Sequence, residues 1–291
     1  LGLSRVLSPE ELLIIANTGD DFEHYGLTIC PDTDTLLYTL AGLDNPQLGW
    51  GRADESWAFM QTLAGLGGAD WFRLGDRDLA LHVLRSHRLR AGEALSAITD
   101  DLRQRFGIGP RILPMSDDPV RTRIGTDQGW LDFQDWFVRL RAEPLARAVQ
   151  FAGVEKARAQ PALLDALQAK PRGIVLCPSN PFISIEPILA LPGLRDAIKA
   201  SGAPVVAVSP IIAGQAVKGP TARMFEALGI TPSAAAVAAR YGDLLHGYVM
   251  EEGDDADGIV PRVFHAATLM RNLDDKMNLA RQVLAAIDAL R

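Results

Sequence analysis

Residues 173–208 read GIVLCPSNPFISIEPILALPGLRDAIKASGAPVVAV. Two short apolar runs, at 173–177 and 205–208, lie on either side of a segment that is predicted to be helical over residues 185–200. A strand, a helix and a second strand at this spacing indicate a right-handed crossover between two parallel strands. This stretch therefore predicts an α/β fold with an open, mainly parallel sheet flanked by helices.

The same alternation of strands and helices extends in both directions along the chain. It predicts strands at 12–17, 111–115, 121–126 and 248–250, and helices beginning near Leu36 and at 55–66, 162–169 and 221–228. A last helix is predicted from an apolar stripe formed by Met277, Ala280, Leu284 and Ile287. Residues 1–75 and 160–291 are assigned to the core. Residues 76–159, which begin with charged helical sequence, are assigned to an insertion or cap with a helical layer.

The composition limits the class of protein. Of the 291 residues, 48% are hydrophobic, which suits one large α/β unit. The formal net charge of −7 argues against a general nucleic-acid binder. Cys30 and Cys177 are the only cysteines, too few for a disulfide framework, and this indicates a reducing cytoplasm. The sequence predicts neither a membrane span nor a leader peptide.

Acidic residues gather behind the first predicted strand. Asp20 and Asp21 follow the strand directly, and His24, Asp32 and Asp34 come shortly afterwards. Clustered carboxylates of this kind are the ligands that Mg²⁺ prefers in proteins. The alternative is that Asp20 and Asp21 merely end the strand, while Asp32 or Asp34 caps the next helix. The sequence therefore predicts a Mg²⁺ site and leaves the structural interpretation open.

The loops that follow the apolar strands predicted at 12–17, 173–177 and 205–208 are expected to converge on one site. Ligands of open parallel sheets bind beyond the carboxyl ends of the strands. The second of these loops carries Ser179, Asn180 and Ser184 ahead of a helix. It forms either an anion cradle or an ordinary capped turn. The third loop contributes Lys218, which either contacts a phosphate or remains solvated.

The insertion places flat and flexible apolar side chains near polar loops. They are Met115, Phe133, Trp136 and Phe137, and Trp50 lies in a similar setting between two glycines. Such side chains can hold a flat ring system. The alternative is that they belong to the hydrophobic core.

Taken together, motifs along nearly the whole chain resemble those of one family, the 2-phospho-L-lactate transferases of coenzyme F-420 biosynthesis. The motifs are, in order, Thr18-Gly19-Asp20-Asp21 with His24 and Gly26, Cys30-Pro31-Asp32-Thr33-Asp34-Thr35, Gly49-Trp50-Gly51, Leu74-Gly75-Asp76-Arg77-Asp78, Met115-Ser116-Asp117-Asp118-Pro119-Val120, Pro178-Ser179-Asn180-Pro181 and Lys218-Gly219-Pro220. An ordered series is far more specific than any one member. The resemblance implies a Rossmann-like core with a helical insertion.

The resemblance also implies a Mg²⁺-dependent reaction. The terminal ribityl hydroxyl of 7,8-didemethyl-8-hydroxy-5-deazariboflavin attacks a guanosine diphosphate-linked phospho-acid donor, and GMP leaves. The residues that it places at the catalytic centre are Asp20, Asp21, His24, Asp32 and Asp34, and the four aspartates are also the expected metal ligands. The donor nucleotide is expected at Pro178, Ser179, Asn180, Ser184, Lys218 and Gly219. The deazaflavin is expected at Trp50, Met115, Ser116, Asp117, Asp118, Thr122 and Trp136. A homodimer is implied as well.

Several alternatives stay open. Phospholactyl, phosphoenolpyruvyl and phosphoglyceryl donors differ by a few atoms, although an Ala- and Arg-rich composition, typical of GC-rich bacterial DNA, favours the enolpyruvyl donor. The second candidate function is a non-catalytic, sugar-nucleotide-binding regulatory protein of a related family, which is expected to have a Gly- and Ser-rich continuation after its aspartates. A dinucleotide-dependent oxidoreductase is disfavoured because no glycine fingerprint is visible.

The 2-phospho-L-lactate transferase family normally opens with a strand, a glycine-rich turn and a lysine, and that stretch is expected to have preceded Leu1.

Overall fold

The computed structural model describes residues 1–45, 51–216 and 221–291. Its central feature is a sheet of four parallel strands in the order β13, β12, β9 and β8. These strands span Arg262–Ala266, Gly247–Glu251, Val205–Val208 and Ile174–Leu176, respectively. The two apolar runs that begin and end residues 173–208 are thus neighbouring parallel strands, and the predicted α/β fold is confirmed.

Helices and shorter strands surround this sheet. The helices are α1 (Gly2–Val6), α2 (Pro31–Ala41), α3 (Ala58–Gly65), α4 (Asp76–Arg90), α5 (Leu95–Arg105), α6 (Pro161–Gln168), α7 (Glu186–Leu189), α8 (Leu194–Ser201), α9 (Thr221–Ala227), α10 (Ala234–Tyr241) and α11 (Leu273–Asp288). The other strands are β1 (Leu13–Ala16), β2 (Phe22–His24), β3 (Leu27–Ile29), β4 (Arg111–Pro114), β5 (Arg121–Thr126), β6 (Gly129–Asp132), β7 (Ala146–Ala152), β10 (Ile211–Ile212) and β11 (Gln215–Ala216). Short helical turns are η1 (Pro9–Glu11), η2 (Asp135–Arg139), η3 (Val154–Lys156), η4 (Pro181–Ile185) and η5 (Gly242–Leu244).

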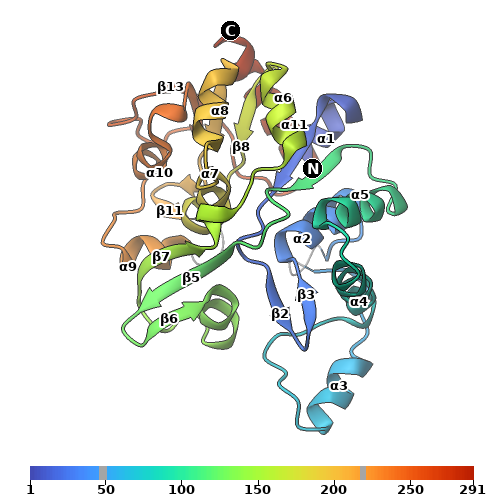
Figure 1. Ribbon diagram of the computed structural model, residues 1–291. Coiled ribbons are helices and arrows are strands. Elements are labelled where there is room, and N and C mark those ends of the chain that lie inside the picture. The colour runs from blue at the N-terminus through green and yellow to red at the C-terminus, as the bar shows by residue number, and fades with distance from the viewer. Residues whose placement is uncertain (46–50, 217–220) are drawn as a thin grey trace.

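The side chains of β9 alternate between two apolar layers. Val205 and Ala207 pack in the same cluster as residues of α6 and α8. Val206 and Val208 pack in the cluster that contains four buried residues of α11. All four side chains are buried because helices lie on both sides of the strands (Figure 1). This two-sided burial explains why the strand is continuously apolar in sequence.

β1 and β4 form a second, separate sheet of two parallel strands. β1 pairs with β4, with Leu13 opposite Arg111 and Ala16 opposite Pro114. β4 therefore pairs with a strand of the predicted core, although it lies within residues 76–159, which were assigned to the insertion. β5 forms an antiparallel sheet with β6 and β7, which lies at the lower left of Figure 1, and α3 and α4 lie at the lower right. The division of the chain into a core and an insertion stays a prediction.

Three predicted helices differ in extent from those observed, and the one predicted at 55–66 is shorter, since α3 spans Ala58–Gly65. α2 begins at Pro31, and not near Leu36, so Asp32 lies inside its first turn instead of preceding the helix. The helix predicted over residues 185–200 is interrupted after α7, and α8 begins only after Gly193, whose φ is 72°. Proline at 192 and a left-handed glycine explain the break, because neither residue continues an α-helix readily.

The apolar stripe of α11 is also displaced from its predicted position. Ala280 and Ile287 are buried as expected, whereas Met277 and Leu284 are only half-buried. Leu279, Val283 and Ala286 complete the buried face. In addition, α10 and β13 were not predicted from the sequence.

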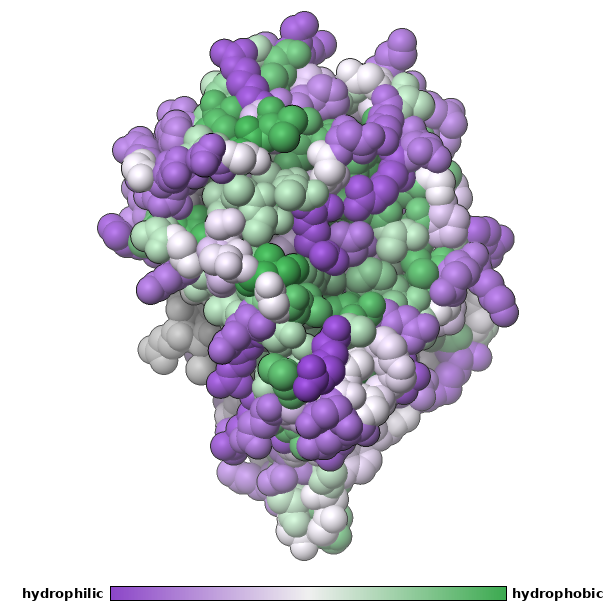
Figure 2. All heavy atoms as spheres, turned by 90° about the vertical axis from the view of Figure 1, so that its left-hand side faces the viewer, coloured by the Kyte–Doolittle hydropathy of each residue, from purple (hydrophilic) through white to green (hydrophobic). Residues whose placement is uncertain are grey.

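One face of the molecule is shown in Figure 2. Hydrophilic residues surround smaller apolar areas on this face. None of the helices in the described part of the chain is long and apolar enough to cross a membrane.

Replacing Met250 by Ala should destabilise the protein by about 2–5 kcal/mol, because it removes a fully buried side chain of β12 and leaves a cavity. The free energy of unfolding, measured in urea, tests this expectation. Val260→Ala is the matched control, since Val260 is 96% exposed and its truncation should cost less than about 0.5 kcal/mol. Equal losses in the two variants would contradict the assignment of Met250 to the core.

Candidate functional site

The loop after β1 is tied to two other segments through Asn17. The side-chain Nδ2 of Asn17 donates to Asp32 Oδ2 at 2.8 Å and to the Ile183 carbonyl at 3.1 Å. Its Oδ1 accepts the Gly19 amide at 2.8 Å. A Cβ atom on Gly19 would lie 2.7 Å from Thr122 Oγ1, so this close approach requires glycine. The loops after β1 and β8, two of the three that were predicted to converge, therefore meet, and the start of α2 joins them.

Asp20 and Asp32 form one pair of carboxylates where the loops after β1 and β8 meet the start of α2. Asp20 is buried, and Asp32 is half-buried in the first turn of α2. Burial, together with the charge of Asp32, raises the pKa of Asp20 well above its ordinary value. Burial also raises the pKa of Asp32, against the effect of its hydrogen bond from Asn17. Hydrogen bonds from Thr122 and Asn17 oppose the rise at Asp20, but its Oδ1 has no hydrogen-bond partner among the described residues.

Asp21 is adjacent in sequence but is influenced by different groups. Burial raises the pKa of Asp21 to about 7, although the charges of Arg121 and Arg85 and a hydrogen bond with the Cys30 thiol oppose the rise. Its Oδ1 has no hydrogen-bond partner within the described ranges. A carboxyl group that titrates near neutral pH is suited to accept a proton during a reaction.

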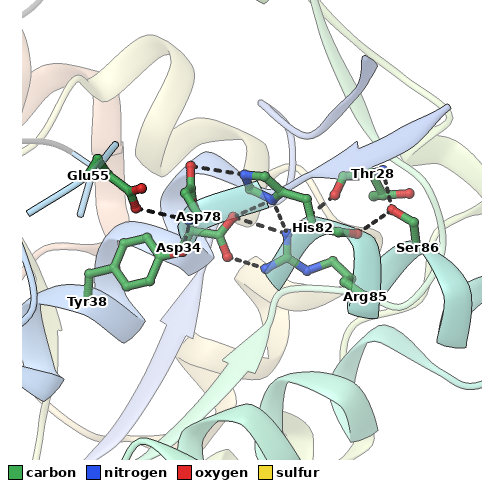
Figure 3. Close-up of polar contacts among 8 residues, drawn as sticks. All are labelled: Thr28, Asp34, Tyr38, Glu55, Asp78, His82, Arg85 and Ser86. Atoms are coloured by element: carbon green, nitrogen blue, oxygen red, sulfur yellow. Dashed lines mark hydrogen bonds and ion pairs between the residues drawn. The ribbon is translucent and has the colours of Figure 1, made fainter. Parts of the chain in front are cut away.

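Asp34 is bound by a buried arginine. Both terminal nitrogens of Arg85, a fully buried residue of α4, donate to the Asp34 carboxylate, one of them over 3.0 Å (Figure 3). His82 Nδ1 lies 3.6 Å from the same carboxylate, and His82 Nε2 lies 3.1 Å from Asp78 Oδ2. The Tyr38 hydroxyl donates to the other oxygen of Asp78. Asp34 thus belongs to a buried network that the sequence analysis did not predict.

Two groups of residues could hold a metal ion. Asp34, Asp78 and His82 bring ligand atoms within 4.8 Å of one another, but Arg85 and Tyr38 already hydrogen-bond to the carboxylates. Asp20 and Asp32 instead repel one another and retain an unpaired, buried oxygen. A hard divalent cation would compensate both, and the second group fits Mg²⁺ better.

His24 lies in an aromatic environment. It ends β2 in a hairpin whose turn residues, Tyr25 and Gly26, both have positive φ. The centroid of the His24 ring lies 5.1 Å from that of Trp71 and 5.9 Å from that of Phe72. Burial lowers the pKa of His24, although the charge of Asp135 opposes this shift. Its catalytic role stays a prediction, because these contacts are those of a packed side chain.

The residues expected to bind the donor nucleotide have varied surroundings. Asn180 Oδ1 accepts the Phe182 amide at 2.9 Å, and its Nδ2 donates to Met224 Sδ, so this side chain holds the turn itself. The other described residues of this set are half-buried, and they are Pro178, Ser179 and Ser184. Lys218 and Gly219 lie outside the described residues.

Most residues expected beside the deazaflavin are engaged elsewhere. Asp117 accepts the Ser96 amide in the first turn of α5, and Asp118 accepts hydrogen bonds from Arg158. Trp136 is buried, and its Nε1 donates to a backbone carbonyl at 2.8 Å. The remaining described members are all buried, and they are Met115, Ser116 and Thr122. Trp50 falls outside the described ranges.

A cavity of about 210 Å³ adjoins the Asp34 network. Its lining includes Arg52, Trp57, Arg73 and Asp78. The Arg73 guanidinium lies 4.3 Å from the centroid of the Trp57 ring. Glu55, which also lines the cavity, accepts the Asp78 amide at 2.9 Å and so fixes the start of α4 (Figure 3). The cavity therefore combines a flat ring with cationic and anionic groups.

Sequence reasoning missed the roles of Asn17, Tyr38 and Arg85. A signal was present for Arg85, because Asp78, His82 and Arg85 are spaced by four and three residues. This spacing places three polar side chains on one face of a helix. That this face is buried could not be read from the spacing.

The fold and this site define an α/β protein whose candidate site lies at the carboxyl ends of parallel strands. Residues 1–281 match the family model described as 2-phospho-L-lactate transferase CofD. The chain belongs to this CofD family of transferases.

Curated relatives cover most or all of the chain. A phosphoenolpyruvate transferase of Kitasatospora aureofaciens is 42% identical over 304 residues, which span 100% of this chain and 94% of the relative. The enzyme of the same name from Streptomyces coelicolor is 41% identical over 303 residues, with the same two coverages. That of Thermobifida fusca is 44% identical over 262 residues, which are 88% of this chain and 80% of the relative.

A solved structure of low sequence identity has the same fold. It is a member of the UPF0052 family from Bacillus halodurans, with a TM-score of 0.60 and 15% identity. The match covers 99% of this chain and 96% of that one. The expected Rossmann-like fold is thereby confirmed, and at this identity the likeness says nothing about activity.

Replacing Asp21 by Asn should stabilise the metal-free protein at pH 8 more than at pH 5. The folded-state pKa of Asp21, about 7, lies above its ordinary value of 3.8. Folding is therefore opposed increasingly as the pH rises from about 4 to 7, and the Asn variant escapes this cost. The difference between the two pH values should be on the order of 2–3 kcal/mol. Urea unfolding in EDTA measures it, and an equal effect at both pH values would contradict the raised pKa of this buried carboxyl.

Proposed function

We propose that this transferase moves a phosphoenolpyruvyl group from a guanosine diphosphate-linked donor to the terminal ribityl hydroxyl of a deazaflavin, with release of GMP. The names of the relatives from Kitasatospora aureofaciens and Streptomyces coelicolor, at 42% and 41% identity, support the enolpyruvyl group. Phospholactyl and phosphoglyceryl donors are the alternatives. The proposal depends most on one observation, the pair of carboxylates of Asp20 and Asp32 where three segments meet.

Phosphoryl transfer requires alignment of the reactants and neutralisation of phosphate charge more than covalent work by the protein. Asp20 and Asp32 would hold a Mg²⁺ ion, which when bound would neutralise charge on the phosphate oxygens. Asn17 keeps the Asp32 carboxylate oriented by its 2.8 Å hydrogen bond. Gly19, which carries no side chain, lets the β1 loop approach β5 closely.

We assign proton removal to Asp21. The ribityl oxygen attacks the donor phosphorus that carries the acid, and its proton passes to the Asp21 carboxylate. The bond from this phosphorus to the bridging oxygen breaks, and GMP leaves with the bonding electrons. A pKa of about 7 supports this role, because half of the groups are then ionised at neutral pH.

We propose that the acceptor ring binds in the cavity that contains Trp57 and Arg73. A flat ring can stack on Trp57, either in the place of the Arg73 guanidinium or beside it. Arg52 offers a second hydrogen-bond donor for the polar edge of the bound ring. The sequence assigned Trp50 to the acceptor, and two residues that follow it, Gly51 and Arg52, line this cavity.

Membership of a family of transferases favours catalysis over the non-catalytic alternative. Turnover would exclude it. The homodimer and the cytoplasmic location that were expected from the sequence stay predictions.

Asp32→Asn should lower the rate of GMP release at least about 100-fold, because it removes one of two proposed metal ligands while preserving size. The assay incubates the full-length protein with deazaflavin, Mg²⁺ and each of the three donors, and follows GMP by mass spectrometry. Asp288→Asn, at an exposed ion pair with Arg172, is the control and should retain full activity. Undiminished turnover in the Asp32 variant would refute the site, and a preference for another donor would refute the enolpyruvyl assignment.

Trp57→Leu should weaken deazaflavin binding roughly tenfold, because a stacking surface is lost. Quenching of deazaflavin fluorescence on titration with protein provides the measurement. Trp130→Leu is the comparison, since Trp130 is exposed on β6 and does not line the cavity. Unchanged affinity in the Trp57 variant would place the acceptor elsewhere.

A further inference from the structure

The sequence places Asp32 and Asp34 in one motif, but the structure gives them opposite surroundings. Asp32 accepts a hydrogen bond from a neutral amide, that of Asn17. Asp34 is ion-paired with Arg85, and the side chains of both partners are almost completely buried. Two carboxylates in the same helical turn therefore have different means of charge compensation.

Arg85 binds Asp34 with the geometry that suits a guanidinium group. Its two terminal nitrogens donate to the two different oxygens of the carboxylate. This paired arrangement is among the strongest that a buried carboxylate can accept. Nη1 also lies 3.4 Å from the Thr28 carbonyl at the hairpin. Arg85 thus links α4 to β3 and to the first turn of α2.

The position of Arg85 coincides with a group of potential metal ligands. Asp34, Asp78 and His82 would otherwise offer three ligand atoms within 4.8 Å of one another. His82 contacts both carboxylates, and Tyr38 donates to Asp78 (Figure 3). The guanidinium supplies the positive charge that this group requires, and it does so permanently because arginine does not lose its proton.

We propose that Arg85 is a positioning residue that binds Asp34 in place of a metal ion, and so restricts the divalent cation to Asp20 and Asp32. This inference rests on the proposed function, which requires that cation. It removes Asp34 from the expected ligands and gives it a different task. The Asp34–Arg85 pair joins the first turn of α2 to α4, and its two charges cancel beside the turn that presents Asp32 to Asn17.

The inference predicts an unusual order of affinities for Mn²⁺, measured by electron paramagnetic resonance of the free ion. Asp34→Asn leaves the buried Arg85 charge without its carboxylate partner, two residues along α2 from Asp32, and should weaken binding roughly tenfold or more. The double variant Asp34→Asn with Arg85→Met removes both charges and should return to within about threefold of the wild type. A ligand role for Asp34 predicts that the double variant stays as weak as Asp34→Asn.

The same charge changes at a distant pair provide the control. Asp288→Asn, alone and with Arg172→Met, alters an exposed ion pair and should leave Mn²⁺ affinity unchanged in both forms. Circular dichroism and thermal unfolding establish that each variant is folded. A loss of affinity that followed melting temperature, and was not reversed in the folded double variant, would overturn the positioning role.

Asp32→Asn separates this inference from the proposed function. Mn²⁺ binding that survives Asp32→Asn would overturn the proposed function itself. Binding that Asp32→Asn abolishes, together with a double variant as weak as Asp34→Asn, would overturn only the role of Arg85. Loss in Asp32→Asn with recovery in the double variant supports both.

Discussion

Burial of negative charge is the constraint on which the rest of this corner of the molecule depends. An ionised carboxylate is costly to remove from water unless an opposite charge or several hydrogen bonds accompany it. Asp34 meets this requirement through the fully buried Arg85. Asp20 does not, and its raised pKa reflects both burial and the neighbouring Asp32. One carboxylate is thus stabilised by an ion pair within the fold, whereas the other is not, and this difference is the basis for the proposed cation site at Asp20.

The first turn of α2 joins these two environments. Asp32 faces Asn17 and the loops at the carboxyl ends of β1 and β8, whereas Asp34 faces α4. The two residues point to different partners because positions two apart on a helix do not share a face. Rigid elements on both sides therefore determine the placement of Asp32, which a mobile loop could not do as closely.

Membership of the CofD family agrees with this arrangement. Motif residues that looked equivalent in sequence have separate tasks in the structure. Asp117 caps α5 and Asp118 holds Arg158, so these carboxylates maintain the loop that brings Thr122 against Gly19. A motif can be characteristic of a family because it builds the site, and not every member of it needs to contact substrate.

The sequence by itself determined the α/β class, the parallel strands at 173–208, and the acidic stretch behind β1, because apolar runs and turn residues act locally. It misplaced the start of α2 and the break before Gly193. It could not divide Asp20, Asp21, Asp32 and Asp34 between roles, since the deciding partner, Arg85, lies 51 positions away from Asp34 along the chain. Only tertiary structure decides which buried carboxylate meets a guanidinium, because the energy of a buried charge depends on distance in space and not on order in sequence.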